Sequence, residues 1–236
     1  MSSRQEEKER RRREREEREA AEAGKVASKR RLQLVAGAVI GLVAIAAVVA
    51  AIASSGGGGS KADAGSSYGS AKIPARKTTN FDAAVKASGC TFKTFTSEGR
   101  THLPSDTAVN NSYKTNPPTS GNHRPTPAQD GVYAPGNTPD KENFVHTLEH
   151  GRIELQYSPK APKVVQDQLN ALFNEPVKGA NGYHMLLFEN NTNMPYEVAA
   201  TAWTHLIGCT TVTDKTWDAL RAFRDRFVDK GPELIP

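Results

Sequence analysis

An unbroken apolar stretch, Leu34 to Ala53, constrains this chain more than any other feature of its sequence. The stretch contains only Leu, Val, Ile, Ala and Gly over 20 residues. A helix rises about 1.5 Å per residue, so this length spans about 30 Å, the thickness of the hydrocarbon core of a bilayer. A buried helix of a soluble domain usually carries a polar stripe, which is missing here. We therefore expect a transmembrane helix over residues 32–53, with one crossing of the cell membrane.

Positive charge flanks the apolar stretch only on its amino-terminal side. Lys25 and the run Lys29–Arg31 precede it, whereas residues 54–60 carry no charge. The positive-inside rule then places the amino terminus in the cytoplasm and the carboxyl-terminal part outside. Ala51-Ile52-Ala53 resembles a signal-peptidase site. However, the apolar region is longer than the roughly 7–15 residues of a signal peptide, and we favour an uncleaved anchor.

The segments around this span have their own compositions. Residues 1–31 hold 12 Lys and Arg against 8 Asp and Glu, many of them at helical spacing, which predicts a charged and partly helical cytoplasmic segment. Residues 54–71 are rich in Gly and Ser, which predicts a flexible linker. Gly37 and Gly41 form a GxxxG pair, a pattern that favours a homodimer through the span.

Charge and motifs exclude several classes of function. Most of the formal net charge of +5 belongs to residues 1–31, so the pI near 9.2 does not indicate nucleic-acid binding by the globular part. The chain has no P-loop or Rossmann glycine pattern, and its G-x-S-x-G match, Gly65-Ser66-Ser67-Tyr68-Gly69, belongs to the Gly/Ser-rich segment rather than to a strand-to-helix turn. Serine hydrolases, nucleotide hydrolases and dinucleotide enzymes therefore lack support.

Residues 72–236 are long enough for one extracytoplasmic domain with its own core. Apolar side chains alternate over Arg152–Tyr157, which predicts a strand, and Tyr183–Glu189 is a short apolar run typical of a second, more buried strand.

Helical periodicity lies between these runs and after them. One amphipathic helix is predicted before Pro176, from the spacing of Val165, Leu169, Leu172 and Phe173, and another from Asp214 to about Lys230. Asn110–Pro139 reads as a long loop rich in Pro and Gly. We expect an α+β domain with a small sheet, two or more packed helices and this loop.

The two cysteines, Cys90 and Cys209, both lie on the side assigned to the oxidising compartment. A disulfide between them is the simplest interpretation. A reactive thiol pair is the alternative, but it would usually show the C-x-x-C spacing that is missing here.

The densest group of metal-ligating side chains is His146-Thr147-Leu148-Glu149-His150, which fits the H-x-x-E-H pattern of inverted zinc metallopeptidases. On a helix, both histidines share a face with Glu149 beside them. On a strand, the histidines share a face and Glu149 points the other way. The first conformation suits a hydrolase and the second a binding site. A peptidase also needs a downstream glutamate as a ligand, which the sequence does not identify, although Glu189 is a candidate.

Further ligands are expected from outside this pentapeptide. His123 follows a proline-stiffened stretch that would hold its imidazole in place, and His184 stands beside Met185 on the second predicted strand. The candidate metal ligands are His123, His146, Glu149, His150 and His184. Imidazoles suit Zn²⁺ or Cu²⁺, and a nearby thioether would favour copper. We interpret His102 and His205 as structural or surface residues.

The chain contains five motifs in a characteristic order: NPPTSGNHRPTP from residue 116, GVY from 131, VHTLEHGRIELQY from 145, ATAW from 200 and GPE from 231. Together they resemble the bacterial family named domain of unknown function 3105, which is common in actinobacteria, over about residues 71–233. Thr204 stands where that family usually has glycine. The resemblance implies a membrane-anchored extracytoplasmic domain, but no established activity. The motif residues that it singles out are Pro117, Pro118, Ser120, Gly121, His123, His146, Glu149, His150 and Gly151.

Taken together, the sequence predicts a single-pass membrane protein whose extracytoplasmic domain binds zinc or copper through histidines for metal handling or sensing rather than catalysis. A zinc-dependent hydrolase with Glu149 as its base is one alternative. A non-catalytic interaction module of the cell envelope, in which the histidines only brace the loop, is the other. The sequence identifies no protein partner.

Overall fold

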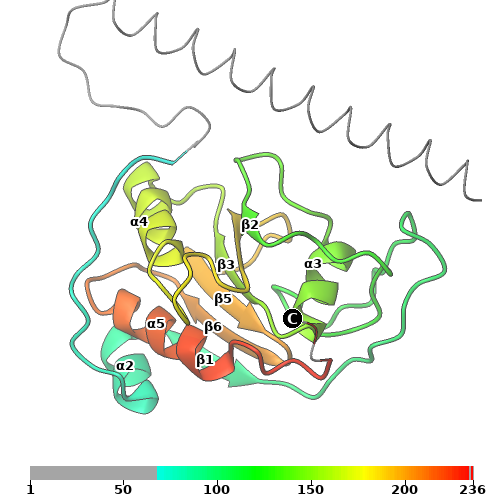
Figure 1. Cartoon of the computed structure of the whole chain (residues 1–236), viewed down its shortest axis with the longest axis horizontal. Coiled ribbons are helices and arrows are strands. Elements are labelled where there is room, and N and C mark those ends of the chain that lie inside the picture. Colours follow the sequence, from blue (N-terminus) through cyan, green and yellow to red (C-terminus); the bar gives the residue numbers. More distant parts are fainter. Residues whose placement is uncertain (1–67, 234, 236) are drawn as a thin grey trace, which may run out of the picture. The chain divides into compact units, whose positions relative to one another are not determined.

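The computed structural model describes residues 68–233 and residue 235, which form an α+β domain with a six-stranded mixed sheet and four helices (Figure 1). This confirms the α+β class. No helix among these residues is long and apolar enough to cross a membrane. The predicted span at 32–53, its GxxxG pair and the charged segment 1–31 lie outside the described residues.

The sheet has the strand order β1-β6-β5-β3-β4-β2. Neighbours from β1 to β3 pair antiparallel, whereas β3, β4 and β2 pair parallel. The strands are β1 (Thr91–Thr94), β2 (Gly131–Val132), β3 (Ile153–Tyr157), β4 (Met185–Glu189), β5 (Val198–Ala202) and β6 (His205–Cys209). Both predicted strands are confirmed as β3 and β4, which are neighbours with Ile153 opposite Met185.

Helices cover the two faces of the sheet unequally. The helices are α2 (Phe81–Ser88), α3 (Lys141–Glu149), α4 (Lys163–Phe173) and α5 (Thr216–Phe227). α2, α4 and α5 lie on one side, and α3 lies on the other with the long loop (Figure 1). The predicted amphipathic helices are confirmed as α4 and α5.

Side chains of β4 alternate between the two faces, as the pleat of a strand requires. Met185 and Leu187 belong to the main core with α4 and α5. Leu186 and Phe188 pack with Phe144 of α3 in a second core. The sheet is thus buried on both sides, which explains why β4 is apolar on both faces from Met185 to Phe188.

The amino-terminal end of the domain is tied into the fold. Tyr68 is buried, and its hydroxyl lies 2.7 Å from that of Tyr157. Tyr68, assigned above to the linker, is therefore packed against the domain. Cys90 and Cys209 form the predicted disulfide, which joins the start of β1 to the end of β6.

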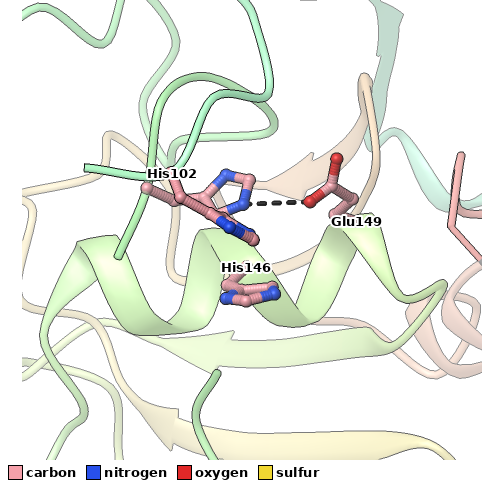
Figure 2. Close-up of side chains that lie close together, drawn as sticks. His102, His146 and Glu149 are labelled. Carbon is pink, nitrogen blue, oxygen red and sulfur yellow. Dashed lines mark ion pairs between the residues drawn. The ribbon is translucent and has the colours of Figure 1, made fainter. Parts of the chain in front are cut away.

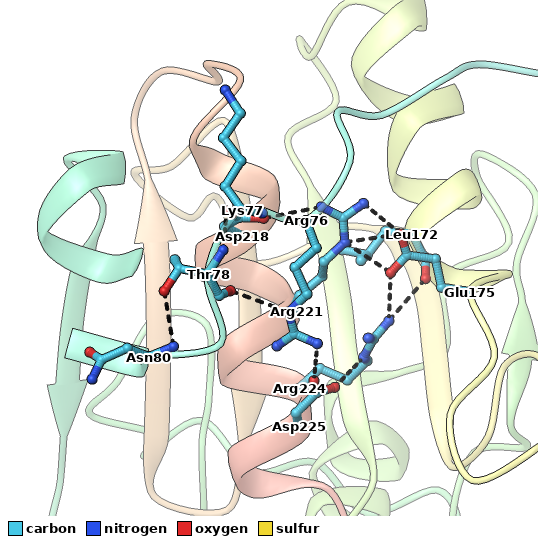
Figure 3. Close-up of polar contacts among 10 residues, drawn as sticks. All are labelled: Arg76, Lys77, Thr78, Asn80, Leu172, Glu175, Asp218, Arg221, Arg224 and Asp225. Atoms are coloured by element: carbon cyan, nitrogen blue, oxygen red, sulfur yellow. Dashed lines mark hydrogen bonds and ion pairs between the residues drawn. The ribbon is translucent and has the colours of Figure 1, made fainter. Parts of the chain in front are cut away.

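A network of buried charged side chains on α5 holds the chain segment that leads into α2 (Figure 3). Arg221 and Arg224 are almost fully buried, and both donate hydrogen bonds to the carboxylate of Glu175, which follows α4. The carboxylate of Asp218 accepts the backbone N–H groups of Lys77 and Thr78. The network joins α4, α5 and the chain that leads into α2.

A single buried carboxyl group lies between α3 and the sheet. Glu154 of β3 is fully buried, and its Oε2 accepts hydrogen bonds from Thr201 Oγ1 at 2.7 Å and Gln156 Nε2 at 3.0 Å. Its Oε1 lies 3.1 Å from Thr147 Oγ1, which also lies 2.6 Å from the carbonyl of Phe144. The one hydroxyl hydrogen of Thr147 is donated to the carbonyl of Phe144. A hydrogen bond between Thr147 Oγ1 and Glu154 Oε1 therefore forms when Oε1 carries the proton and donates it.

Burial raises the pKa of Glu154 to about 8, so the folded state retains a proton that the unfolded chain loses near pH 4.5. The stabilisation from this proton is complete below the unfolded pKa and is lost as pH rises through the folded pKa. The free energy of unfolding of the unmodified protein should therefore decrease from pH 5 to pH 9. We predict that this decrease is smaller in Glu154→Gln by at least about 1 kcal/mol. Urea unfolding at both pH values measures the difference. Asp82→Asn, which changes an exposed carboxylate, is the control. An unchanged loss in Glu154→Gln would contradict the assignment.

Candidate metal centre

The H-x-x-E-H sequence lies on α3 and is helical up to Glu149, with His150 at the carboxyl-terminal cap. The apolar side of this helix, Phe144, Val145 and Leu148, packs in the second core against β4. The helical period then brings His146, Glu149 and His150 to another face. This settles the conformation that the sequence leaves open.

Gly151 ends α3 and starts the turn into β3. Its φ of +78° is in the left-handed region that glycine adopts without strain. A Cβ at this position would also lie 2.9 Å from the backbone of Asp229. The helix is therefore short, and the carboxyl-terminal segment of the chain packs directly against its end.

The loop before α3 supplies His123, whose side chain is fully buried. Its backbone N–H donates to the carbonyl of Thr101, and its carbonyl accepts the N–H of Leu103. Gly121 has a φ of +128°, and a Cβ there would lie 2.8 Å from the ring of Tyr113. The proline-rich motif is thus a tightly packed support, as the sequence predicts for this imidazole.

The same backbone pairing brings His102 next to His123. The ring centroid of His102 lies 5.2 Å from that of His123 and 4.8 Å from that of His146. Our interpretation of His102 as an uninvolved residue missed this contact. The contact arises because two loop segments about 20 residues apart in the sequence pair through their backbones. Neither segment has strand periodicity, so nothing in the sequence indicates the pairing.

These residues form the inner cluster, defined as His102, His123, His146 and Glu149 (Figure 2). Each offers one ligand atom, and all four atoms lie within 4.8 Å of one another. His123 Nε2 lies 3.0 Å from Glu149 Oε2, the contact drawn as a dashed line in Figure 2. Three members are buried and His102 is exposed, so the cluster is open to solvent on one side.

Two backbone carbonyls fix the tautomers of the buried imidazoles. His123 Nδ1 lies 2.8 Å from the carbonyl oxygen of Gly121, and His146 Nδ1 lies 2.7 Å from that of Arg124. A carbonyl only accepts, so both Nδ1 atoms carry hydrogen. Burial lowers the pKa of His123, and it lowers that of His146 to about 4. Near pH 7 both rings are neutral, with a lone pair on Nε2.

This arrangement is typical of histidine metal ligands. In these, the ring nitrogen that does not bind the metal usually donates its N–H to a carbonyl or a carboxylate. His123 Nε2 is buried and has no hydrogen-bond donor as partner among the described residues. Burial also raises the pKa of Glu149. A lone pair and a carboxylate oxygen 3.0 Å apart repel each other unless a proton or a cation lies between them. The spacing suits a shared metal ion, since ligand atoms about 2.1 Å from zinc lie roughly 3.0–3.4 Å apart.

A second group, the outer cluster, consists of His146, His150 and Glu233. Among the residues that the structure describes, His150 Nε2 is buried without a hydrogen-bond partner and lies 3.6 Å from Glu233 Oε2. Burial lowers the pKa of His150 to about 4. Glu233 did not emerge from the sequence analysis as a ligand, although the GPE motif contains it. Glu189, the candidate named there, belongs to neither cluster.

Two other predicted contributors lie elsewhere. His184 is in neither cluster, and its Nδ1 lies 2.5 Å from Asp229 Oδ1. Met185 belongs to the main core on the face of the sheet opposite α3, so its thioether gives no argument for copper. His205, as expected, is structural and stacks on Phe92 and Phe227.

The family model described as "Protein of unknown function (DUF3105)" matches residues 102–234. This range starts at His102 and includes every member of both clusters. No curated protein and no solved structure matches the chain.

Proposed function

The chain belongs to the DUF3105 family of proteins of unknown function. We propose that its folded domain binds a divalent transition metal through the inner cluster, and that this metal is zinc. The observation that carries this proposal is the pair of buried, neutral imidazoles of His123 and His146. Each is locked by a backbone carbonyl so that its Nε2 lone pair is free beside Glu149.

The donor atoms favour zinc among the metals of the cell envelope. Three imidazoles and one carboxylate supply four N and O ligands, which suits a tetrahedral Zn²⁺ site. Thiolates are excluded, because Cys90 and Cys209 form a disulfide and the described residues hold no free cysteine. Cu²⁺ is the second occupant that imidazoles suit. Four protein ligands would close a tetrahedral site, which supports metal handling or sensing over catalysis.

We place the metal-binding domain outside the cell. The apolar stretch at 32–53 and the positive charge before it support a single membrane anchor with a cytoplasmic amino terminus. The Cys90–Cys209 disulfide is consistent with this placement, because such bonds persist in oxidising compartments.

We predict that the full chain, purified in detergent, binds Zn²⁺ and that His123→Ala weakens the affinity at least about 100-fold, since a ligand contributes more than its supporting hydrogen bonds do. Isothermal titration with zinc chloride measures the affinity. His205→Gln, which changes a structural histidine outside both clusters, is the matched control and should bind like the unmodified protein. Equal affinities in all three proteins would contradict the proposal.

A zinc-dependent hydrolase is the second candidate, and one observation favours it. α3 places His146 and His150 one turn apart with Glu149 beside them, and Glu233 supplies the downstream carboxylate that this pattern requires. In this case Glu149 is a general base rather than a ligand.

Glu149→Gln separates the two candidates. If Glu149 is a ligand, we predict that the variant loses at least about tenfold in zinc affinity. The hydrolase candidate instead predicts unchanged affinity and a loss of at least about 100-fold in turnover of a fluorogenic peptide mixture. Unchanged affinity in a protein without peptidase activity would contradict both roles of Glu149.

The placement of the domain has its own test. We predict that a protease added to intact cells removes an epitope tag fused after Pro236, whereas a tag fused before Met1 is cleaved only after the cells are permeabilised. Protection of the carboxyl-terminal tag in intact cells would contradict an extracytoplasmic domain.

A further inference from the structure

We propose that the site holds two divalent cations at once, the second of them bound by the outer cluster of His146, His150 and Glu233. This inference rests on the proposed function, because it adds a neighbouring ion to the metal site described above. It assigns roles to His150 and Glu233, which the inner cluster does not include.

His150 has a buried nitrogen that no described residue satisfies. Its side chain is 9% exposed, and its Nε2 is buried without a hydrogen-bond partner among the described residues. A buried nitrogen left in this state destabilises the fold. The nearest carboxylate oxygen, Oε2 of Glu233, is 3.6 Å away, which is too far for a hydrogen bond. That separation is close to the spacing of two ligands on one ion.

The number of lone pairs divides the donors into two sets. His146 belongs to both clusters, but its Nδ1 is committed to the carbonyl of Arg124, so it has one lone pair to offer. When His146 binds the second ion, the first ion keeps His102, His123 and Glu149. Each ion then has two imidazoles and one carboxylate. The closed four-ligand site proposed above therefore describes the domain with one ion bound, and each ion of the pair has open coordination positions.

Backbone packing holds Glu233 at the end of α3. The N–H of Glu233 donates to the carbonyl of Glu149 at 3.0 Å, and the N–H of Asp229 donates to that of Gly151 at 2.8 Å. A Cβ on Gly231 would lie 2.1 Å from the Glu149 carbonyl oxygen, so only glycine allows this approach. The GPE motif thereby brings its carboxylate to His150.

Charge balance also fits a pair of ions. Two cations a few ångströms apart repel each other strongly, and one carboxylate in each set offsets this repulsion. The neighbouring cation Arg152 is already engaged. It lies 3.4 Å from Asp130, and its Nη1 donates to the carbonyls of His150 and Ile235.

The experiment is equilibrium dialysis of the full chain in detergent against buffered Zn²⁺, with elemental analysis of zinc per chain at saturation. We expect two equivalents in the unmodified protein and one in Glu233→Gln. His150→Gln should give the same loss and guards against a folding defect specific to one variant. Glu189→Gln, which removes a carboxylate outside both clusters, should retain two. Circular dichroism verifies that each variant is folded.

The outcomes separate this inference from the proposed function. No bound zinc in the unmodified protein overturns both. One equivalent overturns the second ion and leaves the inner cluster as the metal site. Two equivalents in the unmodified protein and also in both Glu233→Gln and His150→Gln overturn the assignment of the second ion to the outer cluster.

Discussion

The site depends on two hydrogen bonds from imidazole rings to backbone carbonyls. The bonds from His123 to Gly121 and from His146 to Arg124 fix the tautomers and ring orientations, while burial keeps both rings neutral. The folded chain thus desolvates two nitrogen lone pairs and a carboxylate within a few ångströms of one another. Such a group of desolvated donors is unfavourable by itself, and a cation stabilises it. Metal binding and the stability of this region are therefore expected to be coupled.

The rest of this side of the domain supports that group of donors. α3 packs its apolar side on β4 and presents His146, Glu149 and His150 on another face. The proline-rich loop buries His123, and the carboxyl-terminal segment closes over the end of the helix. Gly151 and Gly231 allow these backbones to approach each other. Motifs that are distant in the sequence thus meet at one end of α3, which gives a physical reason for their occurrence together.

Local patterns in the sequence predicted the amphipathic helices α4 and α5 and the strands β3 and β4, and the disulfide followed from the count of two cysteines. The conformation of the H-x-x-E-H segment could not be predicted, because its letters fit both periods and packing on β4 decides between them. His102 and Glu233 were missed because they reach the site through loop pairing at long range. His184 precedes β4 with a φ of +47°, and it pairs with Asp229 rather than with the other histidines.

X-ray absorption at the zinc K-edge of the loaded protein tests the central claim most directly, because it reports which atoms surround the metal. The account predicts a first shell of nitrogen and oxygen at about 2.0–2.1 Å, with the outer-shell scattering typical of imidazole rings. His123→Ala should reduce the imidazole contribution. A sulfur shell at about 2.3 Å, or a shell of oxygen without imidazole scattering, would contradict the claim that the buried histidines hold the metal.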